Sequence, residues 1–225
     1  MTHTVEQIER SVAVPADGVS LDGNLVLPAE ASGVVLFAHG SGSSRHSPRN
    51  RFVARALNAQ HLGTLLIDLL TSEEEAIDAR TGDLRFDIEL LAGRLVAAID
   101  WLSNRPETRE LKIGCFGAST GAGAALLAAV ARPDAVAAVV SRGGRPDLAG
   151  QAMQQVRAPT LLIVGGRDYQ VIELNKSALE QLGRAERKRL DIVPGATHLF
   201  EEPGTLEQVA HLAADWFREH LRPAA

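Results

Sequence analysis

Five short runs of apolar residues constrain the fold of this chain most strongly. They are residues 34–38, 64–67, 112–116, 135–140 and 160–164. Unbroken apolarity over such a run is typical of a parallel strand that is covered on both faces. Between the runs, apolar residues recur at three- and four-residue steps and predict helices over 50–60, 84–102, 119–131, 172–182 and 205–221. Strands that alternate with helices predict an α/β fold with a parallel sheet and helices on both faces.

The two ends of this pattern differ from its middle. Residues 12–14 and 23–27 read as antiparallel strands around a turn-rich segment at 15–18, and 189–193 as the last strand. The stretch 70–83 is the longest connection without an obvious element, which makes it a candidate lid. No insertion is large enough for a separate cap domain. We therefore expect one domain spanning residues 1–225.

Composition excludes several classes of function. The formal net charge of −5 does not predict a nucleic-acid-binding face, because phosphate binding normally requires clustered Lys and Arg. Cys115 is the only cysteine, so neither an intramolecular disulfide nor a multi-cysteine metal site can form. The first ten residues lack a secretory pattern, and no apolar stretch approaches the ~20 residues of a membrane span. We expect a cytoplasmic protein that does not interact with membranes.

The segment Gly117-Ala118-Ser119-Thr120-Gly121 carries the strongest chemical signal. It directly follows a predicted strand and opens a predicted helix, and a sharp turn at that point strains and exposes the central serine. The flanking glycines remove side chains that would clash there. The amino terminus of the helix also favours negative charge developing on the serine oxygen. Ser119 is the predicted nucleophile.

A serine nucleophile needs a histidine base that a carboxylate orients. Asp168 follows the strand at 160–164 through Gly-Gly-Arg, and His198 follows the last strand through Pro-Gly-Ala-Thr. In this kind of site the order along the chain is serine, acid, histidine. Asp168 is the predicted acid and His198 the predicted base, with Asp147 as an alternative acid.

The oxyanion of the tetrahedral intermediate needs hydrogen-bond donors. One predicted donor is the N–H of Thr120, which follows the nucleophile. The second is the N–H of Ser41, in the loop His39-Gly40-Ser41-Gly42-Ser43 after the first parallel strand. His39 and the nearby His46 permit a metal-site interpretation, but a packed His39 that hydrogen-bonds within its loop is the simpler one.

At these segments the chain resembles the α/β-hydrolase superfamily, and within it the small cap-less group related to dienelactone hydrolase. The resemblance implies a mostly parallel eight-stranded sheet and hydrolysis through an acyl-enzyme. It assigns Ser119, Asp168 and His198 the same three roles. Dienelactone hydrolases proper have cysteine at the elbow, whereas this chain has serine, which points toward general carboxylesterase chemistry. We expect Cys115, four residues earlier, to be a buried core thiol.

Arginines gather in two loops at the same sheet edge. Arg45 follows the first parallel strand and Arg142 follows the strand at 135–140. Arginine binds carboxylate or phosphate in a bidentate manner, so either residue could bind an anionic group of the substrate. The competing hypothesis is that they pair with Glu73, Glu74 and Glu75.

Together these patterns predict a serine hydrolase that cleaves small carboxylic esters or lactones without a cofactor or metal. A thioesterase, acyltransferase or peptidase would use the same residues. A noncatalytic hydrolase-like binding domain and a metal-dependent hydrolase are two further hypotheses from different classes. The partner expected is a small-molecule ester, and the chain is expected to be a monomer or a small homo-oligomer.

Overall fold

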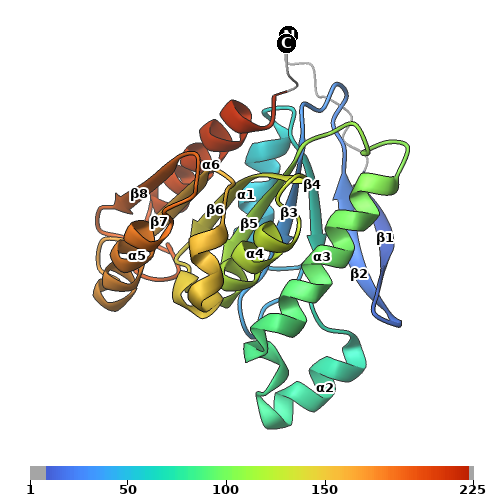
Figure 1. Cartoon of the computed structure of the whole chain (residues 1–225), viewed down its shortest axis with the longest axis horizontal. Coiled ribbons are helices and arrows are strands. Elements are labelled where there is room, and N and C mark those ends of the chain that lie inside the picture. The colour runs from blue at the N-terminus through green and yellow to red at the C-terminus, as the bar shows by residue number, and fades with distance from the viewer. Residues whose placement is uncertain (1–8, 223–225) are drawn as a thin grey trace.

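Eight strands form one sheet in a computed structural model that describes residues 9–222. Their order across the sheet is β1-β2-β4-β3-β5-β6-β7-β8 (Figure 1). β2 pairs antiparallel with both β1 and β4, and all remaining neighbours pair in parallel. The strands are Glu9–Ala16, Val19–Val26, Val34–Ala38, Gly63–Ile67, Ile113–Ala118, Val136–Arg142, Thr160–Gly165 and Lys188–Val193. The mostly parallel eight-stranded sheet is thereby confirmed.

Helices cover both faces of the sheet. α3, α4 and α5 lie on the face toward the viewer in Figure 1, and α1 and α6 lie behind it. The helices are α1 Pro48–Asn58, α2 Ser72–Thr81, α3 Ile88–Asn104, α4 Thr120–Ala131, α5 Tyr169–Gln181 and α6 Thr205–His220, with 3₁₀ segments η1 Leu84–Phe86 and η2 Pro146–Gln155. This arrangement confirms the two-sided covering that the apolar strands predict.

The central strands are apolar throughout because each face meets its own core. Successive side chains of a strand point to opposite faces. In β3, Leu36 packs in the core beneath α3 and α4, whereas Phe37 packs in the core beneath α1 and α6. All five residues of β3 are buried. The strand carboxyl ends are consequently held rigidly at one edge, where the candidate site residues emerge.

The expectation of an unstructured connection at 70–83 is wrong, because this segment contains helix α2. Thr71 caps its first turn through a reciprocal capping box with Glu74, and Gly82 ends it in a left-handed conformation at φ 73°. Such a box satisfies two backbone donors that the helix itself cannot pair. α2 projects beyond the body of the fold (Figure 1) and buries only Asp78, which is why apolar periodicity does not reveal it.

The helix predicted over 84–102 is interrupted. Residues 84–86 form η1, and α3 begins at Ile88 after Asp87, whose carboxylate accepts a hydrogen bond from the Leu90 N–H. Aspartate competes for backbone donors and so favours a helix start over a helix interior. The 3₁₀ segment η2 was not predicted either, and it places Asp147 in a helical turn after β6.

Within residues 9–222, none of the helices has the length and apolar character that crossing a membrane requires.

Candidate active site

Ser119 occupies a strained turn between β5 and α4. Its backbone has φ 50° and ψ −122°, a region that non-glycine residues rarely adopt. The turn is tight: a Cβ on Gly117 would lie 2.5 Å from Ala122 Cα, and one on Gly121 would lie 2.4 Å from the Ala38 carbonyl oxygen. Only glycine fits at either place, so the sequence pattern and the elbow geometry have the same steric cause.

Asp168 and His198 meet at the same edge. Asp168 stands between β7 and α5, and its Oδ2 accepts a hydrogen bond from His198 Nδ1 at 2.6 Å. The Asp168 side chain is 15% exposed and that of His198 is 40% exposed, so the pair has a sheltered end and an accessible end. This bond places the proton on Nδ1 and leaves the His198 Nε2 lone pair available.

Backbone contacts connect this pair to the elbow. The Ser119 N–H donates to the Arg142 carbonyl oxygen at 3.2 Å, at the end of β6. The next residue, Gly143, approaches His198 so closely that a Cβ on it would lie 3.5 Å from His198 Nδ1. The structure therefore brings the three predicted residues, Ser119, Asp168 and His198, to one region of the sheet edge.

Asp147, which could have served as the acid, has a different partner. It forms a two-bond ion pair with Arg145, at 2.7 and 2.9 Å. Since its carboxylate is engaged within its own loop, Asp168 is the acid that contacts the histidine.

The loop after β3 lies directly against the elbow. A Cβ on Gly40 would be 3.0 Å from Ser119 Cβ. The Ser41 N–H, the predicted oxyanion donor, instead donates to the side-chain hydroxyl of Thr120 at 2.9 Å. Ser41 and Thr120 are thus adjacent as predicted, but one donor already has an acceptor, which the sequence did not indicate.

His39 is a packed histidine that holds its loop. Its Nε2 accepts the Leu69 N–H at 3.0 Å, so its Nδ1 carries the proton and donates to the Gly40 carbonyl oxygen at 2.9 Å. Burial lowers the pKa of His39, against smaller opposing effects of the Gly40 hydrogen bond and Asp68. For His39 the sequence allowed two interpretations, a metal ligand and a packed histidine that hydrogen-bonds within its loop. Its contacts are those of the packed histidine.

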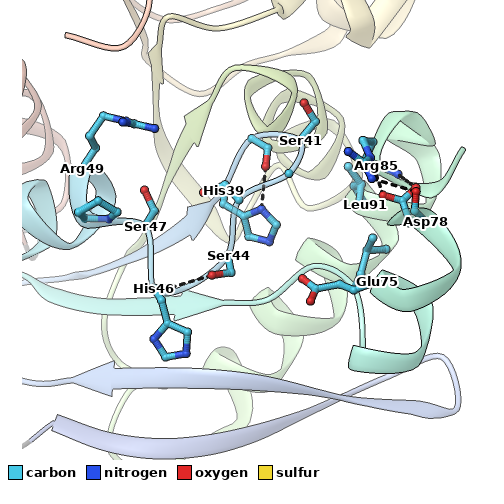
Figure 2. Close-up of a pocket in the computed structure, with 15 residues that line it drawn as sticks. His39, Ser41, Ser44, His46, Ser47, Arg49, Glu75, Asp78, Arg85 and Leu91 are labelled. Atoms are coloured by element: carbon cyan, nitrogen blue, oxygen red, sulfur yellow. Dashed lines mark hydrogen bonds and ion pairs between the residues drawn. The ribbon is translucent and has the colours of Figure 1, made fainter. Parts of the chain in front are cut away.

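A cavity of about 570 Å³ lies beside the loop after β3 (Figure 2). Gly40 in its wall packs on Ser119, but Ser119, Asp168 and His198 do not line it themselves. The loop after β3 forms much of its wall, and residues of α2, η1 and α3 form the opposite side. Figure 2 shows Arg49 at one end and Glu75 with the Asp78–Arg85 ion pair at the other. Burial, and next the charge of Asp68, raise the pKa of Glu75. The contribution of α2 to this wall was not predicted, because α2 itself was not.

The two arginines singled out in the sequence have different environments. Arg45 pairs with Asp68 and also reaches Asn24 at 3.1 Å. Arg142 is 6% exposed, and among the described residues its guanidinium donates one hydrogen bond, to Asn50 Oδ1 at 3.3 Å. In the described part of the chain neither forms an ion pair with Glu73, Glu74 or Glu75, so the pairing hypothesis is wrong. Glu74 pairs with Arg94 instead, and Arg45 acts on Glu75 only through its charge. Burial and the neighbouring charge of Arg49 lower the pKa of Arg142 to about 10.

Groups of metal-ligating side chains and the cysteine complete the description of the site region. Residues 9–222 hold no group of three or more His, Cys, Asp or Glu side chains arranged to bind a metal ion. Cys115 is buried in β5, as expected, and burial raises the pKa of its thiol to about 12.

Comparison with known proteins places this geometry in context. The model of the dienelactone hydrolase family matches residues 52–221. A crystal structure of a dienelactone hydrolase from Anabaena variabilis is 62% identical, with a TM-score of 0.93 over 96% of this chain and all of that one. Est1E from Butyrivibrio proteoclasticus shares the fold at 18% identity, with a TM-score of 0.76 over 93% and 98% of the two chains.

Curated relatives carry a different name. Two strains of Mycobacterium tuberculosis each have a protein called a putative phosphoribosyl transferase that is 58% identical over 213 residues. The match covers 95% of this chain and 47% of the relative. This chain thus spans about half the length of the curated relatives it matches.

Proposed function

The chain belongs to the dienelactone hydrolase family, and we propose that it is a serine hydrolase that cleaves small carboxylic esters or lactones. Membership makes it a hydrolase of the α/β-hydrolase fold. The observation that carries the finer proposal is the strained elbow at Ser119, at the sheet edge where Asp168 holds His198. The relatives named as transferases are about twice as long, so the proposal for this chain rests on the site it contains.

In the proposed mechanism His198 activates Ser119. Nε2 accepts the hydroxyl proton while Oγ attacks the ester carbonyl carbon, and Asp168 stabilises the imidazolium that forms. The protonated histidine then donates that proton to the leaving alkoxide, and an acyl-enzyme remains. In the second half, His198 takes a proton from water, the resulting hydroxide attacks the acyl carbon, and Ser119 leaves with its proton restored.

The amide N–H groups of Thr120 and Ser41 are the proposed donors to the oxyanion. Thr120 begins α4, and the first amides of a helix have no acceptor within it. The partial positive charge at that helix end adds to the stabilisation. Removing one such donor typically costs about 3 kcal/mol of activation free energy.

A fluorophosphonate probe tests the proposal, because it reacts covalently with activated serine nucleophiles. We expect the wild-type protein to be labelled and Ser119→Ala not to be, with Ser43→Ala, in the neighbouring loop, labelled like the wild type. A folded wild type that resists the probe would favour the noncatalytic binding domain. Labelling that persists in Ser119→Ala would move the nucleophile elsewhere.

Substrate class requires a second measurement. A series of 4-nitrophenyl esters of increasing acyl length is compared with matched thioesters and anilides. We expect the highest kcat/KM for short acyl esters, because no separate cap domain encloses a long acyl chain above the elbow. Faster turnover of thioesters or anilides would instead assign a thioesterase or a peptidase that uses the same residues.

A further inference from the structure

The segment 142–145, at the end of β6, holds both backbone groups of Ser119. The Ser119 N–H donates to the Arg142 carbonyl oxygen at 3.2 Å, and the Ser119 carbonyl oxygen accepts the Arg145 N–H at 3.0 Å. A strained backbone such as that of Ser119 persists only where its surroundings over-determine it. The position of this segment therefore determines where the elbow presents the serine.

The same segment lies against the histidine. Gly143 has φ 52°, and a Cβ on it would lie 3.2 Å from the His198 carbonyl oxygen. Gly144 is packed more tightly still, because a Cβ there would overlap Ser141 Oγ and lie 2.6 Å from Ala122 Cβ. Packing as close as this transmits displacements instead of absorbing them. A shift of the segment would consequently reach both the serine and the histidine.

A buried amide connects this segment to the helix that follows the acid. Asn175 lies in α5 and has no exposed surface, and its Nδ2 donates to the Gly144 carbonyl oxygen at 3.0 Å and to the Val171 carbonyl oxygen at 2.8 Å. The second bond stays within α5, whereas the first joins two elements. Among residues 9–222 the Asn175 Oδ1 has no hydrogen-bond partner, so the side chain acts through its donors.

Helix α5 in turn carries Asp168 at its start. The Asp168 carbonyl oxygen accepts the Ile172 N–H at 2.9 Å, which ties the acid into the first turn. Asn175 follows seven residues later, close to two helical turns, and so lies on the same side of α5 as Asp168. Because continuous backbone hydrogen bonds make a helix stiff, a displacement of α5 at Asn175 also displaces Asp168.

We propose that Asn175 is a positioning residue, which holds α5 to the segment 142–145 and thereby sets the distance between the Asp168–His198 pair and Ser119. The role in catalysis rests on the proposed function, because acyl transfer requires the histidine to reach the serine hydroxyl. A misplacement of reacting groups by about 1 Å can cost about a hundredfold in rate. The amide touches none of the reacting atoms and acts through the elements that carry them.

Two substitutions remove the bond to Gly144. Asn175→Leu keeps much of the side-chain volume and loses both donors. Asn175→Ser retains a hydroxyl that can donate to the Val171 carbonyl oxygen within the helix but is too short to reach Gly144. The serine variant isolates the bond between the two elements, and it keeps the test decisive should Asn175→Leu fail to fold.

Asn58 provides the matched control. It is also buried, and its Nδ2 also makes two hydrogen bonds, to the Leu62 carbonyl oxygen at 2.9 Å and to Thr64 Oγ1 at 3.0 Å. These contacts join the end of α1 to the start of β4, at the edge of the sheet opposite the elbow. Asn58→Leu and Asn58→Ser therefore remove the same kind of buried amide far from the site.

Kinetics with a short 4-nitrophenyl ester separate positioning from folding. Well below the melting temperatures, kcat should fall at least tenfold in both Asn175 variants while KM stays within twofold, because the lost geometry belongs to the transition state. The Asn58 variants should keep kcat within twofold at a similar loss of melting temperature. The proposal is overturned if the Asn175 variants keep the wild-type kcat, or if equally destabilised Asn58 variants lose as much.

Crystal structures of the wild type and Asn175→Ser measure the proposed effect without any hydrolysis. The distance between Ser119 Oγ and His198 Nε2 should be longer in the variant by about 0.5 Å or more, the tolerance within which such sites remain productive. An unchanged distance overturns the proposal. A longer distance in the variant, combined with a wild type that hydrolyses no ester, would contradict the proposed function and leave the positioning by Asn175 standing.

Discussion

The Ser41 backbone N–H and the Thr120 hydroxyl are hydrogen-bonded to each other at 2.9 Å, across the mouth of the proposed oxyanion hole. The two residues are 79 positions apart in the chain and meet because β3 and β5 are adjacent parallel strands. An amide that already has an acceptor must release or share it before it can donate to a developing oxyanion. The Thr120 side chain is thus a competitor for the catalytic donor.

Thr120→Val removes that competitor and keeps the shape of the side chain. A hydrogen bond of this kind contributes about 1 kcal/mol net, so its removal should raise kcat for a short nitrophenyl ester up to about fivefold. KM should change little, because the effect belongs to the transition state. Thr120→Ser retains the hydroxyl and should behave like the wild type. A fall in kcat of Thr120→Val would mean instead that the bond positions the loop for catalysis.

Asp168→Asn tests the orienting role of the carboxylate. The amide can still approach His198, but it no longer stabilises the imidazolium and can select the opposite tautomer. We expect kcat/KM to fall by about three to four orders of magnitude while the melting temperature changes little. Asp147→Asn is the control, because Asp147 contacts Arg145 and not the histidine. A comparable loss in Asp147→Asn would restore it as the acid.

The pH dependence of stability should carry the signature of His39. Burial lowers its pKa in the folded protein below the usual 6.5, so the folded state binds fewer protons than the unfolded one as the pH falls below about 6.5. The free energy of unfolding then decreases on acidification, by at most about 1.4 kcal/mol per pH unit from this group. Denaturant unfolding at several pH values between 7 and 5 measures the slope.

His39→Gln removes this titration and should flatten the slope in that window. Its amide can still accept the Leu69 N–H, which limits the structural loss. His211→Gln, on the exposed face of α6, is the matched control and should keep the wild-type slope. An identical slope in His39→Gln would assign the acid sensitivity to different groups.

Sequence patterns anticipated the parts of this protein that local chemistry determines. The strands 34–38 and 160–164 are apolar because two helix layers bury them, and the glycines around Ser119 are required by contacts shorter than 3 Å. Helix α2 was not predicted because its sequence signal is a capping box, Thr71 with Glu74, and not an apolar stripe. A search for capping signals in 70–83 could have found it.

Further features lay beyond any local pattern. The acceptor of the Ser41 N–H, and the absence of a described carboxylate partner for Arg142, depend on which loops the sheet order brings together. The pairing of Arg45 with Asp68 likewise joins segments after β3 and β4. Charge alone suggested three glutamates as partners, but α2 turns Glu74 toward Arg94 instead.

Glu74 connects α2 to the body of the fold, and its charge should matter for stability. Its carboxylate pairs with Arg94, which is 3% exposed and also donates to the Ala16 carbonyl oxygen at 2.8 Å. Glu74→Gln keeps a hydrogen-bonding group but leaves the buried guanidinium without a counter-charge. We expect a loss of about 3 kcal/mol, or a melting temperature lower by roughly 6–12 °C.

Glu73→Gln is the matched control for that variant, since the Glu73 carboxylate makes no ion pair among the described residues, whereas Glu74 does. Exposed substitutions of this kind usually change stability by less than about 0.5 kcal/mol. Equal melting temperatures for Glu74→Gln and Glu73→Gln would show that α2 detaches from α3 in solution and that Arg94 reaches water.

Cys115 should be inert in the folded protein, which separates serine chemistry from thiol chemistry at this elbow. With its pKa raised to about 12, only about one thiol in ten thousand is ionised at pH 8, and the group is buried in β5. Ellman's reagent should therefore react with unfolded protein and not with native protein. Pretreatment with iodoacetamide should leave ester hydrolysis intact, and Cys115→Ala should retain it as well. Loss of activity on native alkylation, abolished by Cys115→Ala, would mean that the strand opens and that the thiol reaches the site four residues from Ser119.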